Sequence, residues 1–535
     1  MPSVKVLLID GYIDDPAALG VPPYISPMVR SVAGAAKDAG AEVEYVTIDN
    51  IRKGMGIPKA AVSVVLSGNT VPGRYLRSMP MSLNEISAIL PKLSGWKLIG
   101  GSSASSDVAE AFDFSIGTDL AASLYDGLTG KEVNERARTL DEWNRWMLLG
   151  ADIVKEHQDH PQPLIAEVET YRGCHRFMTG GCSYCIEPMK GRPLMRSPAD
   201  ILEEASRLRD LGVRNVRIGG QTCIISYGSE DFLGIPKPKP DIVNGLFKEL
   251  HEMRFDVLHV DNANPSVISE HADESVSILR SLTKYCTSGN VLALGMESAD
   301  PAVIGANNLN SSPEQVMDAV RMINRVGSER GANGMPKLLP GLNLISGLDG
   351  ETPMTNDMNV RFLNELLSEG LMVRRINIRQ VLPVRREFKT KVDHNKFKLY
   401  KRSIRENIDA PMLRKIVPTG TILKNAYLEI VDNGITFGRQ IGTYPILIGI
   451  PYRTDVNRFC DIIVTDHGFR SITGIEYPFP VNKANMNAIS SLPGIGKKRA
   501  AKIMLARPIT SADCLRKAVG DDAVTERLTN MVSFE

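Results

Sequence analysis

The sequence of 535 residues predicts an α/β protein built from several domains. Apolar strand-like runs alternate with helical stretches up to about residue 405, which is the pattern of sheets covered by helices. Short β-rich runs with turns follow, and the chain ends in helical stretches broken by Pro and Gly. We therefore expect a doubly wound N-terminal domain, a (β/α)6 partial barrel, a small β-barrel and a helical hairpin, at residues 1–160, 161–405, 410–480 and 481–535.

The N-terminal region predicts a doubly wound, Rossmann-like domain. Val4–Ile9 and Val43–Ile48 are strand-like runs, and the alanine-rich Ser31–Lys37 between them is helical. Ile13–Pro27 is rich in Pro, Gly and Ala, which predicts a long loop after the first strand. Folds of this class place their ligands at such strand ends.

The next region repeats a strand–helix rhythm six times, which predicts a parallel partial barrel. Chemistry in such barrels lies at the C-terminal ends of the strands. The expected strands are Ile165–Thr170, Asn215–Gly219, Val257–Val260, Val291–Gly295, Leu342–Ser346 and Ile376–Leu382.

Composition excludes several classes of protein. Hydrophobic residues make up 43% and charged residues 23%, which is typical of folded globular domains. Seven cysteines in this length exclude a disulfide scaffold. No apolar run approaches the roughly 18 residues that span a bilayer, and the first residues resemble a strand rather than a signal peptide. We expect a soluble, cytoplasmic protein without a membrane partner.

Three of the cysteines form a cluster directly after the first predicted barrel strand. Seven residues separate Cys174 from Cys182, and two separate Cys182 from Cys185. Three thiolates on one loop can hold three irons of a 4Fe–4S cluster and leave the fourth iron open. The same cysteines with His175 could instead hold zinc. The cysteines alone leave both alternatives open.

Polar and glycine-rich segments follow three other predicted barrel strands. They are Gly219-Gly220-Gln221, Glu297-Ser298 and the segment Gly347–Thr352. Each could be an ordinary turn. Their shared position at strand ends, behind a cysteine loop, is hard to reconcile with a zinc ribbon and favours a ligand-binding barrel.

Together these features resemble the radical S-adenosylmethionine (SAM) superfamily over about residues 161–390. The resemblance implies that three cysteines hold one 4Fe–4S cluster and that the methionyl group of SAM chelates the open iron. It also implies that residues in the cysteine loop and after later strands contact SAM. The sequence departs from the family pattern in two ways: glutamine replaces the usual glutamate of the glycine motif, and the first cysteine spacing is longer than usual. The implied metal ligands are Cys174, Cys182 and Cys185, and the implied SAM contacts are Tyr184, Gly219, Gly220, Gln221, Glu297 and Ser298.

The resemblance also implies the chemistry. One electron from the reduced cluster cleaves SAM to methionine and a 5′-deoxyadenosyl radical, so an electron donor is an expected partner. The protein's part is to position a substrate C–H bond and to exclude water. The sequence does not identify further catalytic residues.

The segment Leu492-Pro493-Gly494-Ile495-Gly496-Lys497-Lys498 resembles the turn of a helix-hairpin-helix motif. Free backbone N–H groups at the start of the second helix can hold a phosphate. The implied nucleic-acid contacts are Gly494, Gly496, Lys497 and Lys498. A purely structural hairpin or a protein-docking hairpin is the alternative.

Two features before the hairpin also favour a nucleic-acid partner. Arg374–Lys415 contains 14 Lys and Arg against 4 Asp and Glu, a local net charge of +10 within a chain of net charge +1. The alternative is that this basic segment is an ordinary solvated surface without a partner. Residues 412–479 loosely resemble the TRAM-type barrel of some tRNA-modifying enzymes, so tRNA is the expected partner.

Four functional hypotheses follow. A methylthiotransferase-like enzyme would need a second cysteine set, and residues 1–173 contain no cysteine. A cobalamin-dependent methylase would use the doubly wound domain. The whole layout resembles the radical SAM subunit of archaeal archaeosine synthase, which implies C–N bond cleavage of a lysine-adducted 7-cyano-7-deazaguanine in tRNA and a lysine-transferring partner subunit. A nucleic-acid-binding protein with a structural metal is the non-enzymatic alternative.

Overall fold

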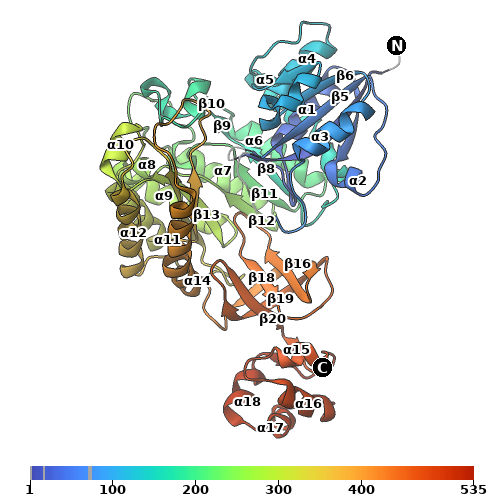
Figure 1. Cartoon of the computed structure of the whole chain (residues 1–535), viewed down its shortest axis with the longest axis vertical. Coiled ribbons are helices and arrows are strands. Elements are labelled where there is room, and N and C mark those ends of the chain that lie inside the picture. Colours follow the sequence, from blue (N-terminus) through green and yellow to red (C-terminus); the bar gives the residue numbers. More distant parts are fainter. Residues whose placement is uncertain (1–2, 16–17, 70–74) are drawn as a thin grey trace. The chain divides into compact units, whose positions relative to one another are not determined.

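The computed structural model describes residues 3–15, 18–69 and 75–535 (Figure 1). The chain divides into two compact units. The first comprises residues 1–181, 186–263 and 273–286, and the second comprises residues 182–185, 264–272 and 287–535. The cysteine loop therefore contributes to both units, with Cys174 in the first and the Cys182–Cys185 turn in the second.

A largely parallel sheet forms the N-terminal domain of the first unit. The parallel strands lie in the order β4-β1-β5-β6-β7, and β2 pairs antiparallel with the end of β1. Numbered along the parallel strands this is order 2-1-3-4-5, whose direction reverses between β1 and β5. The strands are β1 (Lys5–Asp15), β2 (Ala18–Leu19), β4 (Glu42–Thr47), β5 (Val62–Asn69), β6 (Trp96–Gly100) and β7 (Phe114–Ile116).

Helices pack on this sheet. On one side α1 packs tightly against α5: a Cβ on Gly34 would lie 1.9 Å from the carbonyl oxygen of Trp146, so only glycine fits there. On the other side Ile86 and Ile89 of α3 join a core formed with residues of β1, β4 and β5. The helices are α1 (Pro27–Asp38), α2 (Ile48–Arg52), α3 (Leu83–Ile89), α4 (Leu120–Leu128) and α5 (Leu140–Leu149).

The predicted long loop at Ile13–Pro27 is largely extended instead. Strand β1 continues to Asp15, and β3 (Tyr24–Ile25) pairs in parallel with β8 (Ile165–Glu169), where Tyr24 lies opposite Ile165. Residues 16 and 17 of the segment lie outside the description. A strand from the predicted first domain is thus built into the sheet of the next, because β8 offers it a free edge.

The six predicted barrel strands are all present, in two parallel sheets. The first unit contains the order β12-β11-β8-β3, and the second contains β13-β14-β15. Their bounds are β11 (Asn215–Gly219), β12 (Val257–Val260), β13 (Asn290–Glu297), β14 (Leu338–Ser346) and β15 (Arg375–Gln380). The intervening helices are α6 (Pro198–Asp210), α7 (Pro240–Glu252), α8 (Pro265–Glu270), α9 (Ala272–Tyr285), α10 (Pro301–Ala306), α11 (Pro313–Gly327) and α12 (Pro353–Ser368).

A closed five-stranded barrel follows in the second unit, as the sequence predicts. The strands lie in the order β16-β17-β18-β20-β19, and β16 also pairs with β19 to close the barrel. Helices α13 (His394–Ile404) and α14 (Ala410–Ile416) precede it. Its strands are β16 (Ile422–Asp432), β17 (Ile435–Gln440), β18 (Leu447–Ile450), β19 (Arg458–His467) and β20 (Ser471–Tyr477).

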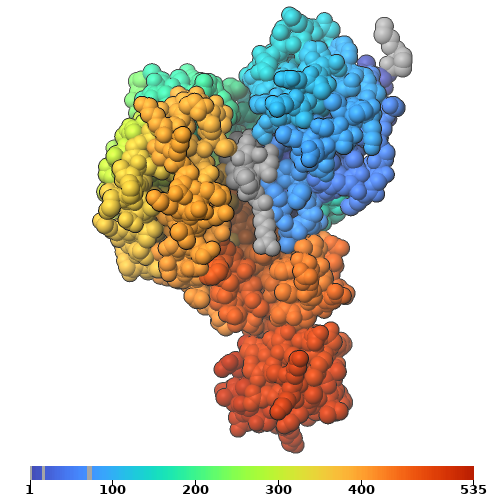
Figure 2. Space-filling model, in the orientation of Figure 1, coloured from blue at the N-terminus to red at the C-terminus, as the bar shows by residue number. Residues whose placement is uncertain are grey.

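Residues 481–535 form a rounded helical lobe, coloured red-orange in Figure 2. Its helices are α15 (Met486–Ser490), α16 (Lys497–Leu505), α17 (Ala512–Val519) and α18 (Asp522–Thr529), and β22 (Val532–Ser533) returns to pair with β21 (Phe479–Pro480). Across the described ranges, no helix combines the length and the apolar character needed to cross a bilayer.

Candidate active site

The part of the cysteine loop that belongs to the first unit begins at a short two-stranded sheet. Strand β9 (Tyr171–Arg172) pairs antiparallel with β10 (Leu194–Met195), so the chain leaves and returns at the same place. The Gly173 N–H donates to Glu187 Oε2 over 3.1 Å. Residues His175–Thr179 then form a short 3₁₀ segment, kinked at Arg176, that ends at Gly180. Burial raises the pKa of the Cys174 thiol.

Glycine is needed at the end of this turn. Gly180 and Gly181 have φ of 76° and 59°, a region that L side chains rarely adopt. A Cβ on Gly181 would also lie 2.2 Å from Pro188 Cγ. The sequence-predicted close folding of the loop therefore has a geometric basis, and the longer cysteine spacing is accommodated by the 3₁₀ turn.

The second-unit half is a tight Cys182–Cys185 turn that other segments hold from outside. The Cys185 N–H donates to the Cys182 carbonyl over 3.1 Å. The Ser183 N–H donates to the Asn307 carbonyl, and Arg385 Nη1 donates to the Cys182 carbonyl over 3.0 Å. Sequence reasoning missed Asn307 and Arg385, because nothing in their spacing relates them to the cysteines.

Tyr184, in the same turn, is partly buried and lies close to the buried Glu297 carboxylate. Its ring packs near Val303, Leu309 and Leu348, and burial raises the pKa of its hydroxyl. Burial raises the pKa of Glu297 to about 7. Glu297 also has φ of +63° at a bulge of β13, and its Oε2 has no hydrogen-bond partner. A strained, buried carboxylate with a free acceptor is typical of a ligand-binding position.

The glycine motif lies where the sequence predicts it, at the end of β11. Gly220 has φ of +76°. The buried Gln221 amide donates to the Asp261 carbonyl over 2.7 Å and accepts from Thr170 Oγ1 over 3.1 Å. This amide therefore ties together the ends of β8, β11 and β12. Its predicted role toward the methionyl amine stays a prediction, as does that of Ser298, whose side chain accepts from the Asp300 N–H.

A buried charged ladder crosses the first-unit sheet, and sequence reasoning missed it. Arg217 on β11 donates to Glu167 on β8 over 2.5 Å and also pairs with Asp261 beyond β12. All three side chains are at most 1% exposed. A Cβ on Gly219 would lie 2.5 Å from Glu167 Oε1, so the first motif glycine leaves room for this carboxylate. The available signal was a charged residue inside each apolar strand run.

The donor chemistry of the cysteine loop fits a cluster. All three thiols are free and partly buried, and none is in a disulfide. Over residues 3–15, 18–69 and 75–535, no group of three or more His, Cys, Asp or Glu side chains stands close enough to hold a metal ion. The fit therefore rests on the soft thiolate donors and on the glycine turn, rather than on a gathered ligand set.

Comparison with known proteins gives the family. A family described as "Radical SAM superfamily" matches residues 168–354. The chain therefore contains a radical SAM superfamily domain. It is 42% identical over 504 residues to "Uncharacterized protein MJ0274" of Methanocaldococcus jannaschii, covering 88% of this chain and 93% of that protein, so the two chains are members of one family.

More distant matches cover part of the chain. The tRNA-2-methylthio-N(6)-dimethylallyladenosine synthase of Syntrophobacter fumaroxidans is 26% identical over 213 residues, which is 39% of this chain and 41% of that enzyme. Among solved structures, the radical SAM methyltransferase TsrM of Kitasatospora setae aligns with a TM-score of 0.47 and 15% identity, over 70% of this chain and 73% of that one.

Membership of the radical SAM superfamily implies an enzyme that uses SAM and a 4Fe–4S cluster. Cys174, Cys182 and Cys185 are the residues that would hold the cluster. When bound, the two cofactors supply a carbon-centred radical. This chain's own contribution is the turn held by Asn307 and Arg385, together with Tyr184 beside the buried Glu297 carboxylate.

The basic segment Arg374–Lys415 is partly used inside the protein. Arg374 donates to the Tyr444 and Pro445 carbonyls, and Arg375 stacks 4.1 Å from the centre of the Tyr444 ring. Arg385 holds the cysteine turn, and Arg386 pairs with Asp349 over 2.9 Å. Part of the local charge therefore has a structural role, which composition alone could not reveal.

Proposed function

We propose that this radical SAM enzyme modifies tRNA. The observation that carries the proposal is the strand order of the closed barrel, β16-β17-β18-β20-β19 with β18 and β20 parallel. Five-stranded Greek-key barrels with this order are OB folds, which bind oligonucleotides across their second and third strands and the loops between strands 1–2 and 4–5.

The outer surface of this barrel has side chains suited to bases. Phe437 and Ile435 of β17 share one face with Gly449 of β18, whose Cβ would lie 3.7 Å from each of them. Phe469, in the loop between β19 and β20, is 56% exposed. Exposed aromatic rings on such barrels stack with unpaired bases, which supports a single-stranded or loop region of RNA as the occupant.

The C-terminal hairpin supports the same partner. The turn Leu492–Gly496 joins α15 to α16, and Gly496 lies at the N-terminus of α16 without a side-chain cap. A Cβ on Gly496 would meet no atom within 4 Å, and Lys497 and Lys498 are exposed. A phosphate could therefore approach these free N–H groups.

The finer reaction that we propose is the one of archaeosine synthesis. The layout of a cysteine-free N-terminal domain, radical SAM core, small barrel and terminal hairpin supports C–N bond cleavage on lysine-adducted 7-cyano-7-deazaguanine, after a separate subunit has transferred the lysine. A methylthiotransferase reaction is less well supported, because residues 1–173 contain no cysteine for a second cluster.

Anaerobic incubation with SAM, a reductant and tRNA that carries the lysine adduct tests this function. We expect tRNA-dependent release of 5′-deoxyadenosine and the appearance of archaeosine in a nucleoside digest measured by mass spectrometry. Unadducted tRNA is the control and should give no archaeosine. Cleavage of SAM with no change in any nucleoside of the lysine-adducted tRNA would contradict the proposal.

Replacing Lys497 and Lys498 by alanine tests the hairpin. Each lost phosphate contact removes about one unit from the slope of log affinity against log salt. We expect the double variant to flatten that slope by about one to two units in filter binding, with iron content and uncoupled SAM cleavage unchanged. Lys337→Ala, which removes a partly exposed lysine paired with Glu329, is the control. An unaltered slope with full tRNA turnover would mean that the hairpin docks a protein.

A second candidate is a cobalamin-dependent methylase, favoured by the 2-1-3-4-5 order of the N-terminal sheet. Such sheets bind a cofactor at the carboxyl ends of the strands where the order reverses, here between β1 and β5. Titration with cobalamin, followed by visible absorbance, decides this alternative. Tight binding and a methylated nucleoside product would favour the methylase over the lyase.

A further inference from the structure

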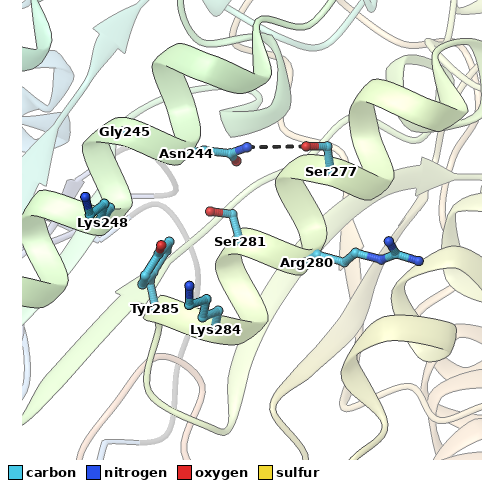
Figure 3. A pocket seen from close by; sticks show the side chains of 8 residues that line it. All are labelled: Asn244, Gly245, Lys248, Ser277, Arg280, Ser281, Lys284 and Tyr285. Atoms are coloured by element: carbon cyan, nitrogen blue, oxygen red, sulfur yellow. Dashed lines mark hydrogen bonds between the residues drawn. The ribbon is translucent and has the colours of Figure 1, made fainter.

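A hollow of about 340 Å³ lies between α7 and α9, in the first unit and outside the residues assigned above (Figure 3). Asn244 Nδ2 donates to Ser277 Oγ and bridges the two helices at one end. Lys248, Ser281 and Lys284 line the space beyond this bridge, with Tyr285 beside them. We call this the α7–α9 groove.

The α7–α9 groove is positively charged. Lys248, Arg280 and Lys284 line it, and no acidic residue does. Lys248 and Lys284 are exposed, and neither forms an ion pair within the described part of the chain. Lys284 Nζ lies 4.9 Å from the centre of the Tyr285 ring, which holds that charge beside the groove. Unpaired cations around a hollow raise the local concentration of anions.

The α7–α9 groove also presents hydrogen-bond donors, and one position on α7 leaves it open. Ser277, Ser281 and Tyr285 contribute hydroxyls on successive turns of α9. Gly245 lies on α7, and a Cβ there would meet no atom within 4 Å. Glycine lowers helix stability, so packing does not explain its presence at this position. Its effect is to widen the groove.

We propose that the α7–α9 groove binds the ribose–phosphate backbone of the RNA substrate. Phosphate oxygens accept from ammonium and hydroxyl groups together, which are the donors that this groove presents. The inference rests on the proposed tRNA function, and it adds a contact on the radical SAM core itself, apart from the barrel and the hairpin. An acidic protein, such as an electron donor, is the competing occupant that the experiment must separate.

The first test is tRNA binding by a Lys248→Gln/Lys284→Gln variant across salt concentrations. Two lost phosphate contacts should reduce the salt slope by about two units, so the wild type should lose about tenfold more affinity than the variant between 50 and 200 mM salt. Lys239→Gln is the matched control: this lysine is also exposed, precedes the same helix and lies outside the groove. The control should keep the wild-type slope.

The second test places a negative charge in the groove and compares it with a neutral side chain of the same size. Gly245→Glu and Gly245→Gln are nearly isosteric, both fit the open position on α7, and both should stabilise the helix. We expect Gly245→Glu to weaken tRNA binding at least about fivefold relative to Gly245→Gln at low salt, by like-charge repulsion of phosphate. Equal thermal midpoints of the two variants would exclude misfolding as the cause.

The outcomes separate the two proposals. Wild-type protein that does not bind tRNA overturns the proposed function, and this inference with it. A second outcome is that the wild type binds tRNA, the lysine variant keeps the wild-type salt slope and the two Gly245 variants bind equally. This outcome overturns the proposal for the groove but leaves the proposed function standing. Unchanged tRNA binding with slower reduction by a protein electron donor, but not by dithionite, also overturns it and assigns the groove to an acidic protein.

Discussion

Cys174→Ala, Cys182→Ala and Cys185→Ala should each abolish cluster assembly and the formation of 5′-deoxyadenosine. Each thiolate binds one iron, so loss of one cysteine leaves only two irons with a protein ligand. A cluster held by two ligands is not retained. The measurement is iron and sulfide content after anaerobic purification, together with chromatography of 5′-deoxyadenosine after incubation with SAM and dithionite. We expect the wild type to be brown with about four irons per chain and each variant to be colourless.

Cysteines outside the loop provide the controls. Cys223 and Cys286 are buried, and we expect Cys223→Ala and Cys286→Ala to retain the cluster. Cys460 and Cys514 are partly buried, and their alanine variants should retain the cluster too. Loss of iron in any of these four would overturn the ligand assignment, and a colourless wild type containing zinc would support the metal-binding alternative.

Glu204→Ala should destabilise the first unit by about 3–5 kcal/mol, because it leaves two buried guanidinium groups without their shared counter-ion. Glu204 on α6 binds Arg30 of α1 over 2.6 Å and Arg196 over 2.5 Å, and all three side chains are fully buried. The measurement is the denaturant midpoint of the first unfolding transition of the full chain.

An exposed ion pair of the same unit provides the contrast. Asp256 pairs with Arg214 over 2.8 Å, and the two side chains are 39% and 41% exposed. Solvent screens such a pair, so Asp256→Ala should cost less than about 1 kcal/mol. Equal costs for Glu204→Ala and Asp256→Ala would contradict the buried arrangement.

Much of the fold could be predicted because its signals are local. The six core strands contain apolar residues in short runs or in alternation, and the small barrel has turns such as Asp432-Asn433-Gly434 between its strands. The segment Ile13–Pro27 was wrongly predicted as a loop. Its Pro and Gly content indicates turns, but the pairing of Tyr24 with Ile165 depends on a strand far away in the sequence, which no local pattern encodes.

The candidate site divides in the same way. The cysteines and Tyr184 could be found because they lie close together in the sequence at a recognisable spacing. The glycine motif could be found because its residues are consecutive and follow a predicted strand. Arg385 and Asn307 could not, because they reach the Cys182–Cys185 turn from separate segments. The Glu297 side chain was found by its position after a strand, but its positive φ and its closeness to Tyr184 depend on tertiary packing.

The pairing of β3 with β8 sets an order for folding during synthesis. Tyr24 leaves the ribosome 141 residues before its partner Ile165 (165 − 24). The short β3 therefore has no pairing partner until the first strand of the radical SAM core has been made, and contacts between residues so far apart in sequence form later than local ones. A nascent chain stalled before residue 165 cannot complete its N-terminal region, and a fragment that begins at residue 161 exposes the edge of β8 to other chains. The two domains that the sequence suggests are thus obliged to mature together.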